Sequence, residues 1–401
     1  MARTIPIFAA KQPSTVTDLE FRVSPPLALY VHVPWCVQKC PYCDFNSHEA
    51  NGEIPEREYV DALIADLQSA LPLIWGRPVV SVFFGGGTPS LLSPAAIDEL
   101  LAAFRALAML SPEAEITLEA NPGTVEAAKF AGFSKAGVNR VSLGTQSFND
   151  DHLKALGRIH GADEAKRAAQ LAAEHFASFN LDLMYGLPGQ TLEQALSDVE
   201  MALSFKPPHL SCYQLTLEPN TRFAAFPPEL PEGDTCADMQ EAIEARLAGA
   251  GFANYETSAF AQTGKQCRHN LNYWHFGDYL GIGAGAHSKL TLHDRVLRQM
   301  RWKHPSAYLQ NIRAGTPVQE ETRIAAAGLP FEFLMNALRL ADGFPPALYE
   351  SRTAQSINGI LPRLLAAQAD GLLAISPERI APTLRGRRFL NVLLERFLDE
   401  T

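Results

Sequence analysis

Six short runs of β-branched and aromatic residues alternate with longer helical patterns, and this alternation constrains the fold more than any other feature. The segments between the runs, such as YVDALIADLQSAL, place apolar residues three and four positions apart, as an amphipathic helix does. Strands that alternate with helices form βαβ units, which build a parallel sheet with its helices outside. Six units are two fewer than the eight of a closed barrel, so the sequence predicts an α/β fold, an open partial (β/α)6 TIM-like barrel. The runs are LALYVHV (27–33), VVSVFF (79–84), EITLEA (115–120), RVSLGT (140–145), FNLDLMY (179–185) and HLSCYQLTL (209–217).

Polar or glycine-rich segments follow five of these six runs. In chain order they read PWC, GGGTPS, NPGT, QSF and GLPG. In parallel α/β folds ligands bind beyond the carboxyl ends of the strands. We therefore expect these segments to meet at one shared site.

The pattern changes near residue 320. FEFLMNALRLADGF, ILPRLLAAQADGLLAI and LRGRRFLNVLLERFL are amphipathic helices around a short β-like pair, LLAIS and RIAPT. This pattern predicts a small, mostly helical, winged-helix-like C-terminal domain. We expect an N-terminal tail at 1–26, a barrel core at 27–265, a connecting segment at 266–319 and the helical domain at 320–401.

Composition and charge exclude several classes of protein. The 401 residues are 47% hydrophobic and 19% charged, which is typical of a soluble globular protein. No apolar run approaches the roughly 18 residues of a membrane span, and IPIFAA is shorter than a signal-peptide core. A net charge of −10 argues against nucleic-acid binding, and the cluster Arg385, Arg387 and Arg388 is expected to be a solvated helix face. We expect a cytoplasmic protein with no transmembrane segment.

Three of the six cysteines lie within eight residues, in YVHVPWCVQKCPYCDFN. Cys36, Cys40 and Cys43 could form a zinc site if His32 or His48 completed the tetrahedron. They could instead hold a four-iron cluster, which with three protein ligands leaves one iron open for a small chelating molecule. The scattered cysteines are expected to fill the core; they are Cys212, Cys236 and Cys267.

The C-x3-C-x2-C spacing at the end of the first strand, with Tyr42 before its last cysteine and Phe45 after it, resembles the radical S-adenosylmethionine (radical SAM) superfamily. The resemblance implies that the three thiolates hold a 4Fe-4S cluster whose open iron chelates SAM. In that superfamily an electron from the cluster cleaves SAM to methionine and a 5′-deoxyadenosyl radical. The barrel core at 27–265 would then be a radical SAM core.

The same resemblance implies a set of SAM contacts near the strand ends. The structural alternative for two of them is an internal salt bridge between Asp182 and Arg158, because buried charges normally pair. The implied SAM contacts are Tyr30, Gly86, Gly87, Thr88, Glu119, Gln146, Arg158 and Asp182.

Further motifs, from LYVHVPWCVQKCPYCDFNSH to HLSCYQLTLEPNT, resemble the oxygen-independent coproporphyrinogen oxidase branch of the superfamily over roughly residues 27 to 400. The oxidase decarboxylates two propionates of coproporphyrinogen. It carries an additional cysteine where this chain has Phe45, and an N-terminal extension, whereas only 35 residues precede Cys36 here. We therefore expect no oxidase activity.

The branch also contains heme chaperones, whose H-N-x-x-Y-W segment is similar to HNLNYW in this chain. The resemblance implies that His269, Asn270, Tyr273 and Trp274 bind heme. Imidazole is a common axial ligand of heme iron, and aromatic rings pack against the porphyrin face. Three further residues close in sequence remain open as the iron ligand: Cys267, His275 and His287.

The sequence thus predicts a heme chaperone that carries a 4Fe-4S cluster, SAM and heme, and passes heme to acceptor proteins. The resemblance suggests acceptors of the respiratory chain. Whether SAM is cleaved stays open, and no catalytic residue is assigned. The alternatives are a radical SAM enzyme acting on a tetrapyrrole, similar to coproporphyrinogen III dehydrogenase, and a zinc-stabilised binding module.

Overall fold

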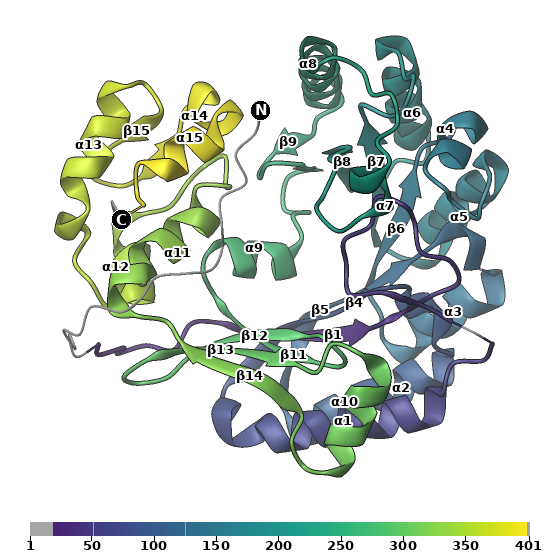
Figure 1. Cartoon of the computed structure of the whole chain (residues 1–401), viewed down its shortest axis with the longest axis horizontal. Helices are drawn as coiled ribbons and strands as arrows, with labels where there is room; N and C mark the ends of the chain where they lie inside the picture. The colour runs from purple at the N-terminus through teal and green to yellow at the C-terminus, as the bar shows by residue number, and fades with distance from the viewer. Residues whose placement is uncertain (1–18, 51, 125, 399–401) are drawn as a thin grey trace.

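The computed structural model describes residues 19–50, 52–124 and 126–398, and its centre is a twelve-stranded sheet (Figure 1). The strand order is β14-β13-β12-β11-β1-β4-β5-β6-β7-β8-β10-β9, so the sheet ends in free edges at β14 and β9 and does not close. The open partial barrel is confirmed. Its six central strands are β1 (Leu27–Val33), β4 (Pro78–Gly86), β5 (Met109–Ala120), β6 (Arg140–Gln146), β7 (Ser178–Tyr185) and β8 (His209–Gln214).

The six central strands coincide with the six runs of the sequence, and neighbouring members pair in parallel. Helices pack on the outer face of the curved sheet (Figure 1). Val31, Leu118 and Leu181 point to that side and belong to the largest buried cluster of the molecule. The outer helices are α1 (Glu56–Ile74), α2 (Pro94–Leu107), α3 (Ala127–Ala136), α4 (Asp150–Ala155), α5 (Ala162–His175), α6 (Leu192–Ser204) and α8 (Gly233–Gly249). The short α7 (Arg222–Ala225) lies instead beside Pro41, whose carbonyl accepts a hydrogen bond from the Phe223 backbone N–H.

Local capping explains where several of these helices begin. The Ser93 side chain accepts a hydrogen bond from the backbone N–H of Ala96, and Pro94 opens α2 at a position where no N–H is needed. Thr191 and Gln194 form a capping box at the start of α6. Both helices therefore begin directly after the polar loops that follow β4 and β7.

Both edges of the sheet carry strands that the sequence analysis did not assign. At one edge β11 (Asp278–Ile282) pairs in parallel with β1, and β12 (His287–Thr291), β13 (Val296–Arg301) and β14 (Val318–Arg323) continue as an antiparallel meander. At the other edge lie two short strands, and one more helix follows β13. These elements are β9 (Ala253–Asn254), β10 (Ala259–Ala261) and α10 (Pro305–Arg313).

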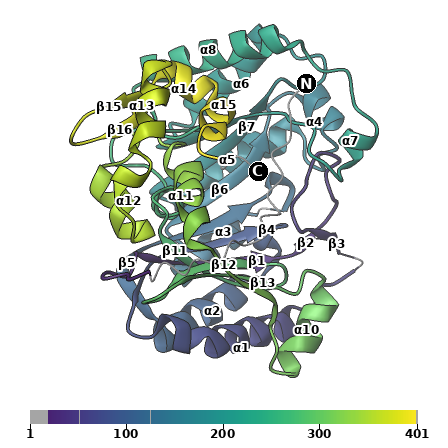
Figure 2. The same ribbon diagram turned by 60° about the vertical axis from the view of Figure 1, so that its left-hand side comes forward.

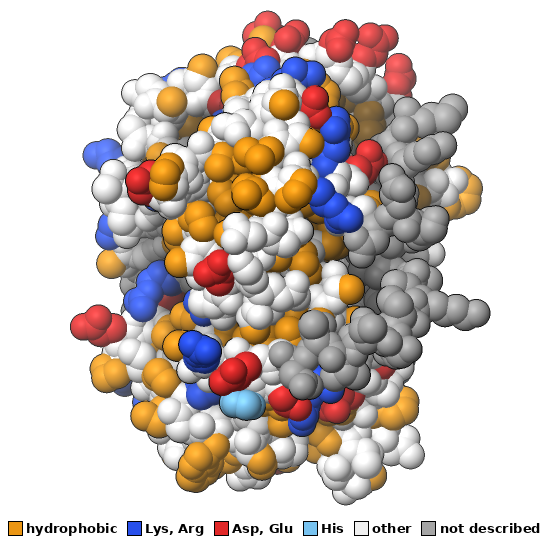
Figure 3. Space-filling view, turned by 90° about the vertical axis from the view of Figure 1, so that its left-hand side faces the viewer, with side chains coloured by type: hydrophobic (Ala, Val, Ile, Leu, Met, Phe, Trp, Pro, Cys, Tyr) orange, Lys and Arg blue, Asp and Glu red, His pale blue; other side chains and the backbone are white. Residues whose placement is uncertain are grey.

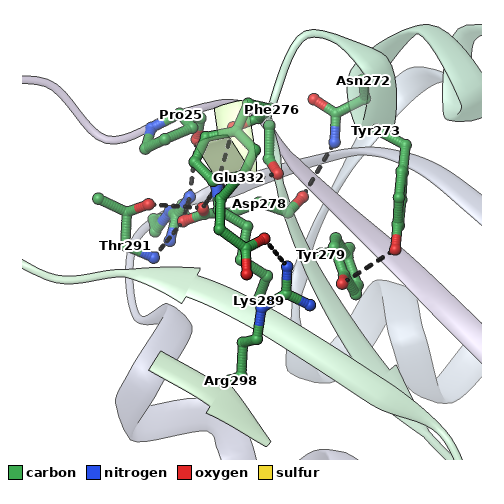
Figure 4. Close-up of polar contacts among 12 residues, drawn as sticks. Pro25, Asn272, Tyr273, Phe276, Asp278, Tyr279, Lys289, Thr291, Arg298 and Glu332 are labelled. Carbon is green, nitrogen blue, oxygen red and sulfur yellow. Dashed lines mark hydrogen bonds and ion pairs between the residues drawn. The ribbon is translucent and has the colours of Figure 1, made fainter. Parts of the chain in front are cut away.

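A buried ionic cluster holds the meander together (Figure 4). Asp278 is fully buried and pairs with Lys289 Nζ at 3.0 Å and with Arg77 Nη2 at 2.8 Å. Its carboxylate also accepts hydrogen bonds from the Thr291 backbone N–H and hydroxyl, each at 2.8 Å. Its backbone carbonyl accepts from Asn272 Nδ2 at 2.9 Å, which ties the neighbouring helix to β11.

The C-terminal domain is helical, as predicted, and surrounds a two-stranded hairpin (Figure 2). It has its own apolar core, which includes Phe333, Phe344, Leu364 and Leu393. Its elements are α11 (Leu329–Ala337), α12 (Pro346–Thr353), α13 (Leu361–Ala369), β15 (Leu373–Ile375), β16 (Ile380–Pro382), α14 (Leu384–Arg388) and α15 (Leu390–Glu395).

The end of the segment treated as an N-terminal tail packs against this domain. Residues 1–18 lie outside the described residues, but Leu19 and Phe21 are buried in the C-terminal core. The backbone N–H of Phe21 also donates to the His293 carbonyl at 2.9 Å. The segment 19–26 is thus an integral part of the fold.

Two of the three clustered arginines join the C-terminal domain to the barrel. Arg387 Nη1 donates to Asn254 Oδ1 at 2.6 Å, and Arg388 Nη1 pairs with Glu241 at 2.8 Å. Among the helices in the described part of the chain, none is long and apolar enough to cross a membrane.

The C-terminal domain carries a group of exposed apolar side chains, and hydrophobic side chains gather on this side of the molecule (Figure 3). Exposed apolar groups that gather on one face are typical of surfaces that meet other molecules. The exposed residues are Leu361, Leu365, Leu384, Phe389, Val392 and Leu398.

Candidate functional site

The cysteine loop lies at the carboxyl end of β1, between two very short paired strands, β2 (Trp35–Cys36) and β3 (His48–Glu49). Lys39 Nζ donates to the Phe45 carbonyl at 3.1 Å and to the Ser47 carbonyl at 3.2 Å, which closes the loop on itself. Asn46 Nδ2 donates to the Ala284 carbonyl at 3.0 Å, which ties the loop to the turn after β11. The three thiols are therefore presented by an anchored loop.

Glycines allow two close backbone approaches around this loop. A Cβ at Gly87 would lie 2.5 Å from the Trp35 carbonyl oxygen, so only glycine lets the GGGTPS segment pass this close to β2. Gly285 has φ +78°, and a Cβ there would lie 2.1 Å from Asn46 Nδ2. The glycine-rich segments bring three separate parts of the chain into contact.

His32 supports the loop and is not placed to ligate a metal. Its Nε2 lies 2.8 Å from the Asn46 carbonyl, so Nε2 carries the proton and donates it. Its Nδ1 then accepts from the Tyr30 hydroxyl at 3.1 Å. Burial lowers the pKa of His32 to about 4, so the ring is neutral at pH 7. Both ring nitrogens are engaged, which argues against a zinc tetrahedron completed by His32.

The three cysteines open onto one pocket at the carboxyl ends of the central strands. Tyr30, which was also expected here, lies deeper and does not line this pocket. Among residues 19–50, 52–124 and 126–398, no group of three or more His, Cys, Asp or Glu side chains is arranged to hold one metal ion. A cubane does not need such convergence, because each thiolate binds a different iron. The expected SAM contacts that line the pocket with the cysteines are Gly86, Gly87, Thr88, Glu119, Gln146, Arg158 and Asp182.

The environment of the thiols suits a positively charged cluster of irons. Burial raises the pKa of the Cys36 and Cys43 thiols. Bound iron would favour the thiolate form and would offset that cost of burial. Beside them, Arg158 Nη1 lies 3.5 Å from Cys40 Sγ and 3.5 Å from the Tyr42 hydroxyl. The donor set therefore fits an iron–sulfur cluster.

The salt bridge between Asp182 and Arg158, considered as an alternative, is wrong. Arg158 Nη2 instead donates to the Gly144 carbonyl at 2.7 Å, and its Nη1 faces the cysteine loop. Asp182 accepts from Asn180 Nδ2 at 2.7 Å and from the Ser142 hydroxyl at 3.3 Å. The two charged groups therefore keep separate hydrogen-bond partners.

Two buried carboxyl groups line the pocket. Burial, with the nearby Asp182 as the second cause, raises the pKa of Glu119 to about 8. Glu119 accepts one hydrogen bond here, from the Gly86 backbone N–H at 3.2 Å. Burial also raises the pKa of Asp182. A cationic ligand would stabilise both carboxylates, and SAM, which carries a sulfonium and an ammonium group, is a ligand of this kind.

Gln146 adopts a backbone conformation that non-glycine residues rarely take. Its φ is +67°, in the left-handed region, at the carboxyl end of β6. Such a residue costs on the order of 1 kcal/mol and is concentrated at functional sites. The turn places Gln146 in the pocket wall.

The HNLNYW segment forms a helix, α9 (Arg268–Trp274), which packs against β4 and β1 and contacts α11 of the C-terminal domain (Figure 1). His269 is 7% exposed, with its Nδ1 3.1 Å from the Ser81 hydroxyl on β4. Its ring lies 4.9 Å from the ring of Phe83, centroid to centroid. Burial lowers the pKa of His269 to about 3, so the imidazole is neutral.

One carboxylate on β5 holds the start of α9. Glu115 accepts hydrogen bonds from the backbone N–H groups of His269 at 3.0 Å and Arg268 at 3.1 Å. It also accepts from Cys267 Sγ at 3.4 Å. Three consecutive residues are therefore fixed to the barrel wall by a single side chain.

The four motif residues divide between two sides of α9. Tyr273 lies one turn beyond His269 and stacks on Tyr279 of β11 with ring centroids 4.7 Å apart. Trp274 lies under the guanidinium of Arg339, 4.5 Å from its ring centroid, toward the C-terminal domain. Asn270 is one turn before Trp274 and shares its side. The structure does not bring all four side chains to one point.

The other candidate iron ligands differ in access. Burial raises the pKa of the Cys267 thiol to about 12, and its Sγ is engaged by Glu115. His287 is exposed on β12, and His275 is half-buried where α9 ends. His269 is the candidate whose imidazole lies on the inner face of the barrel.

Sequence reasoning missed the barrel residues that surround His269. Ser81, Glu115 and Arg140 lie within or at the start of the predicted strands, yet none was singled out. A signal was present for two of them, because Glu115 and Arg140 place charges at the first positions of otherwise apolar runs.

Comparisons with known proteins agree with this architecture. The family model of the radical SAM superfamily matches residues 30–202, and that of the HemN C-terminal domain matches residues 326–389. The heme chaperone HemW of Escherichia coli K12 is 51% identical over 378 residues, covering 94% of this chain and 99% of that protein. The heme chaperone HemW of Haemophilus influenzae Rd is 49% identical, with the same coverage of 94% and 99%.

A more distant relative and one solved structure extend the comparison. The heme chaperone HemW of Mycobacterium tuberculosis H37Rv is 36% identical, covering 93% of this chain and 95% of that protein. The structure of coproporphyrinogen III oxidase (HemN) from Escherichia coli, a radical SAM enzyme, superposes with a TM-score of 0.79. It is 24% identical and covers 93% of this chain and 90% of its own, which shows a shared fold.

Proposed function

Because this chain belongs to the HemW family of the radical SAM superfamily, we propose that it is a heme chaperone, which binds heme and passes it to acceptor proteins. The observation that carries the proposal is the environment of His269. Its Nδ1 is engaged by Ser81, so Nε2 is the ring nitrogen left for an iron atom. The ring is neutral, as a heme ligand must be. We propose His269 as the iron ligand and Tyr273, on the same side of α9, as a second heme residue. Asn270 and Trp274 of the motif lie on another side of the helix, where Trp274 packs under Arg339, so a role for them in heme binding requires contact from that side.

We assign the cofactors to the pocket above α9. Cys36, Cys40 and Cys43 would hold a 4Fe-4S cluster, and SAM would contact the pocket-lining set described above, with Tyr30 as a deeper contact. When bound, these groups supply one-electron chemistry and a source of the deoxyadenosyl radical. The chain's own residues orient them: the cysteine loop is anchored by Asn46 and Lys39.

The alternative of a tetrapyrrole-modifying enzyme has the shared fold in its favour, but a fold does not fix a function. Phe45 stands at the mouth of the pocket, 61% exposed, where the oxidase branch carries its additional cysteine. We therefore propose no coproporphyrinogen oxidase activity. We further propose a cytoplasmic location and acceptors of the respiratory chain, for which the exposed apolar side chains of the C-terminal domain offer a docking surface.

Heme titration of the anaerobically reconstituted protein, followed by absorption spectroscopy, tests the proposal. Wild type should bind one heme per chain, and His269→Ala should weaken binding at least tenfold while keeping its iron, sulfide and SAM content. The control is His293→Ala, which removes an exposed imidazole from a turn and should bind heme as wild type does. Unchanged heme affinity and spectrum in His269→Ala would move the ligand to another residue, and no binding by wild type would refute the chaperone.

A further inference from the structure

Arg140 is a buried cation to which the described residues offer no side-chain hydrogen bond and no ion pair. The side chain is 3% exposed at the start of β6. Its Nε is buried with no hydrogen-bond partner, and no ion pair or cation–π contact joins its guanidinium to any described residue. Placing an unpaired charge in a protein interior costs several kcal/mol, so such groups are normally paired. Arg140 therefore stands out among the charged groups of the barrel.

The two nearest carboxylates are committed elsewhere. Glu115, on the neighbouring strand, is occupied by the N–H groups of Arg268 and His269 and by the thiol of Cys267. Asp182 accepts from Asn180 and Ser142. Both influence Arg140 through their charge, but neither forms an ion pair with it. The protein surrounds Arg140 with negative charge and leaves its guanidinium without a direct acceptor.

A second unpartnered polar group lies beside Arg140 on the same face of the sheet. Thr117 of β5 pairs in register with Arg140, and its hydroxyl is also buried without a hydrogen-bond partner. Two positions further along this register, Glu119 pairs with Ser142, and both of these residues line the pocket that holds the cysteines. Side chains two positions apart on a strand point to the same face. Arg140 and Thr117 thus face the barrel interior, one layer below the pocket.

We infer that Arg140 and Thr117 bind a carboxylate of a ligand that enters the barrel interior, and that this carboxylate is a propionate of heme. The inference rests on the proposed function. Arginine presents a planar fork of donors that matches a carboxylate, and a threonine hydroxyl supplies one further donor.

Two ligands of the proposed function carry carboxylates, and the depth of the site favours heme. The pocket that holds the cysteines is lined by Ser142, Gly144 and Gln146 of β6 but not by Arg140. Arg140 lies instead level with Thr117, one same-face position along β5 from Glu115, which accepts a hydrogen bond from the backbone N–H of His269. Arg140 also acts on His269 through its charge, so the two side chains share this deeper layer. A heme held by His269 would therefore place a propionate nearer to Arg140 than SAM would, because the residues expected to hold SAM line the pocket above.

Replacing the propionates tests the inference without any mutation. The full-length protein, reconstituted anaerobically with its cluster, is titrated with iron protoporphyrin IX and with its dimethyl ester, which has the same ring and iron but no carboxylates. We expect heme to bind about tenfold or more tightly than the ester, as a lost charge-assisted pair predicts. Equal affinities for heme and for the ester would overturn the inference but would not contradict the proposed heme-chaperone function. Failure of both ligands to bind would overturn the proposed function as well.

Variants of Arg140 test whether this residue causes the preference for heme over its dimethyl ester. Arg140→Met should lower heme affinity to that of the ester and leave the affinities for the ester and for SAM unchanged, because it removes the fork of donors but not the iron ligand. Arg140→Lys should retain part of the preference, since lysine keeps the charge but not the fork. Arg167→Met, which removes an exposed arginine, should change nothing.

Two results for Arg140→Met would contradict the inference. Weakened SAM binding with an intact preference for heme over its ester would assign the carboxylate to SAM. Equal loss of heme and ester together with a lower thermal midpoint would make Arg140 a structural residue.

Discussion

The Ser81 hydroxyl lies 3.1 Å from His269 Nδ1 and connects the middle of β4 to α9, the helix of the HNLNYW segment. Both groups are buried, Ser81 at 0% exposure and His269 at 7%. If iron binds Nε2 of a neutral ring, Nδ1 carries the proton and donates it to Ser81. A hydrogen bond of this kind fixes ring orientation and raises the basicity of the ligand.

Ser81→Ala should therefore change the bound heme without changing the fold. We expect about tenfold weaker heme binding and a more positive heme reduction potential, because the imidazole becomes a poorer donor. Redox titration and resonance Raman measurement of the iron–histidine stretch would detect both effects. Ser81→Thr keeps the hydroxyl and should restore wild-type values. A potential and stretch in Ser81→Ala identical to wild type would show that this hydroxyl does not support the iron ligand.

Glu119 makes the stability of the ligand-free protein depend on pH. Its pKa is raised to about 8, so the folded state keeps a proton that the unfolded state releases near pH 4.5. Because the folded state binds more protons between these two values, stability must fall as pH rises from about 4.5 to about 8. Glu119→Gln removes this loss, so its stability relative to wild type, measured by urea unfolding, should increase across that range.

The control for this effect is Glu229→Gln, which makes the same substitution at an exposed carboxyl outside the pocket. A stability difference for Glu119→Gln that stays constant from pH 5 to 8 would mean that Glu119 is ionised in the folded protein.

Asp278 should be among the most sensitive positions for stability. Asp278→Asn removes the negative charge shared by Lys289 and Arg77 and leaves both cations without their carboxylate in the interior. Breaking a buried pair from one side typically costs about 3–5 kcal/mol, measured by urea unfolding. The double variant Asp278→Asn/Lys289→Met should recover part of the loss. Asp294→Asn breaks the more exposed pair with Arg295 and should have little effect. Equal effects at the two sites would contradict the role of burial.

Arg158 should matter for the cofactors and not for heme recognition. Arg158→Met removes the guanidinium beside Cys40 and its hydrogen bond to Gly144. We expect weaker SAM binding by equilibrium dialysis and slower cluster reconstitution, followed as iron and sulfide per chain. Arg158→Lys should restore only part of the SAM binding, because one ammonium group cannot reach both Cys40 and the Gly144 carbonyl. Wild-type SAM binding in Arg158→Met would exclude it from the cofactor shell.

The parts of the fold that depend on local pattern were predictable from the sequence. β1 coincides with its run residue for residue, and Glu119 and Asp182 were recognisable as polar residues on apolar strands. The edge strands were not recognisable, because β12 and β13 are short and carry charged residues such as Lys289 and Arg298. Lys289 is tolerated there because Asp278, eleven residues earlier, neutralises it.

The site residues that the sequence analysis missed also depend on contacts with distant parts of the chain. Ser81 contacts His269 of α9, and Arg140 acts on His269 through its charge, although α9 lies more than a hundred residues further along the chain. No local sequence pattern records such a long-range relationship. The cysteine spacing and HNLNYW were readable because each is complete within a few residues.

The side chains of the HNLNYW segment divide between two sides of α9, and this division links two parts of the molecule. The helix is seven residues long, with Tyr273 stacked against the sheet and the adjacent Trp274 held by Arg339 of the C-terminal domain. A helix this short moves as one unit, so a tilt of α9 displaces both of these side chains. The α9 helix therefore joins the barrel sheet to the C-terminal domain through two adjacent aromatic side chains.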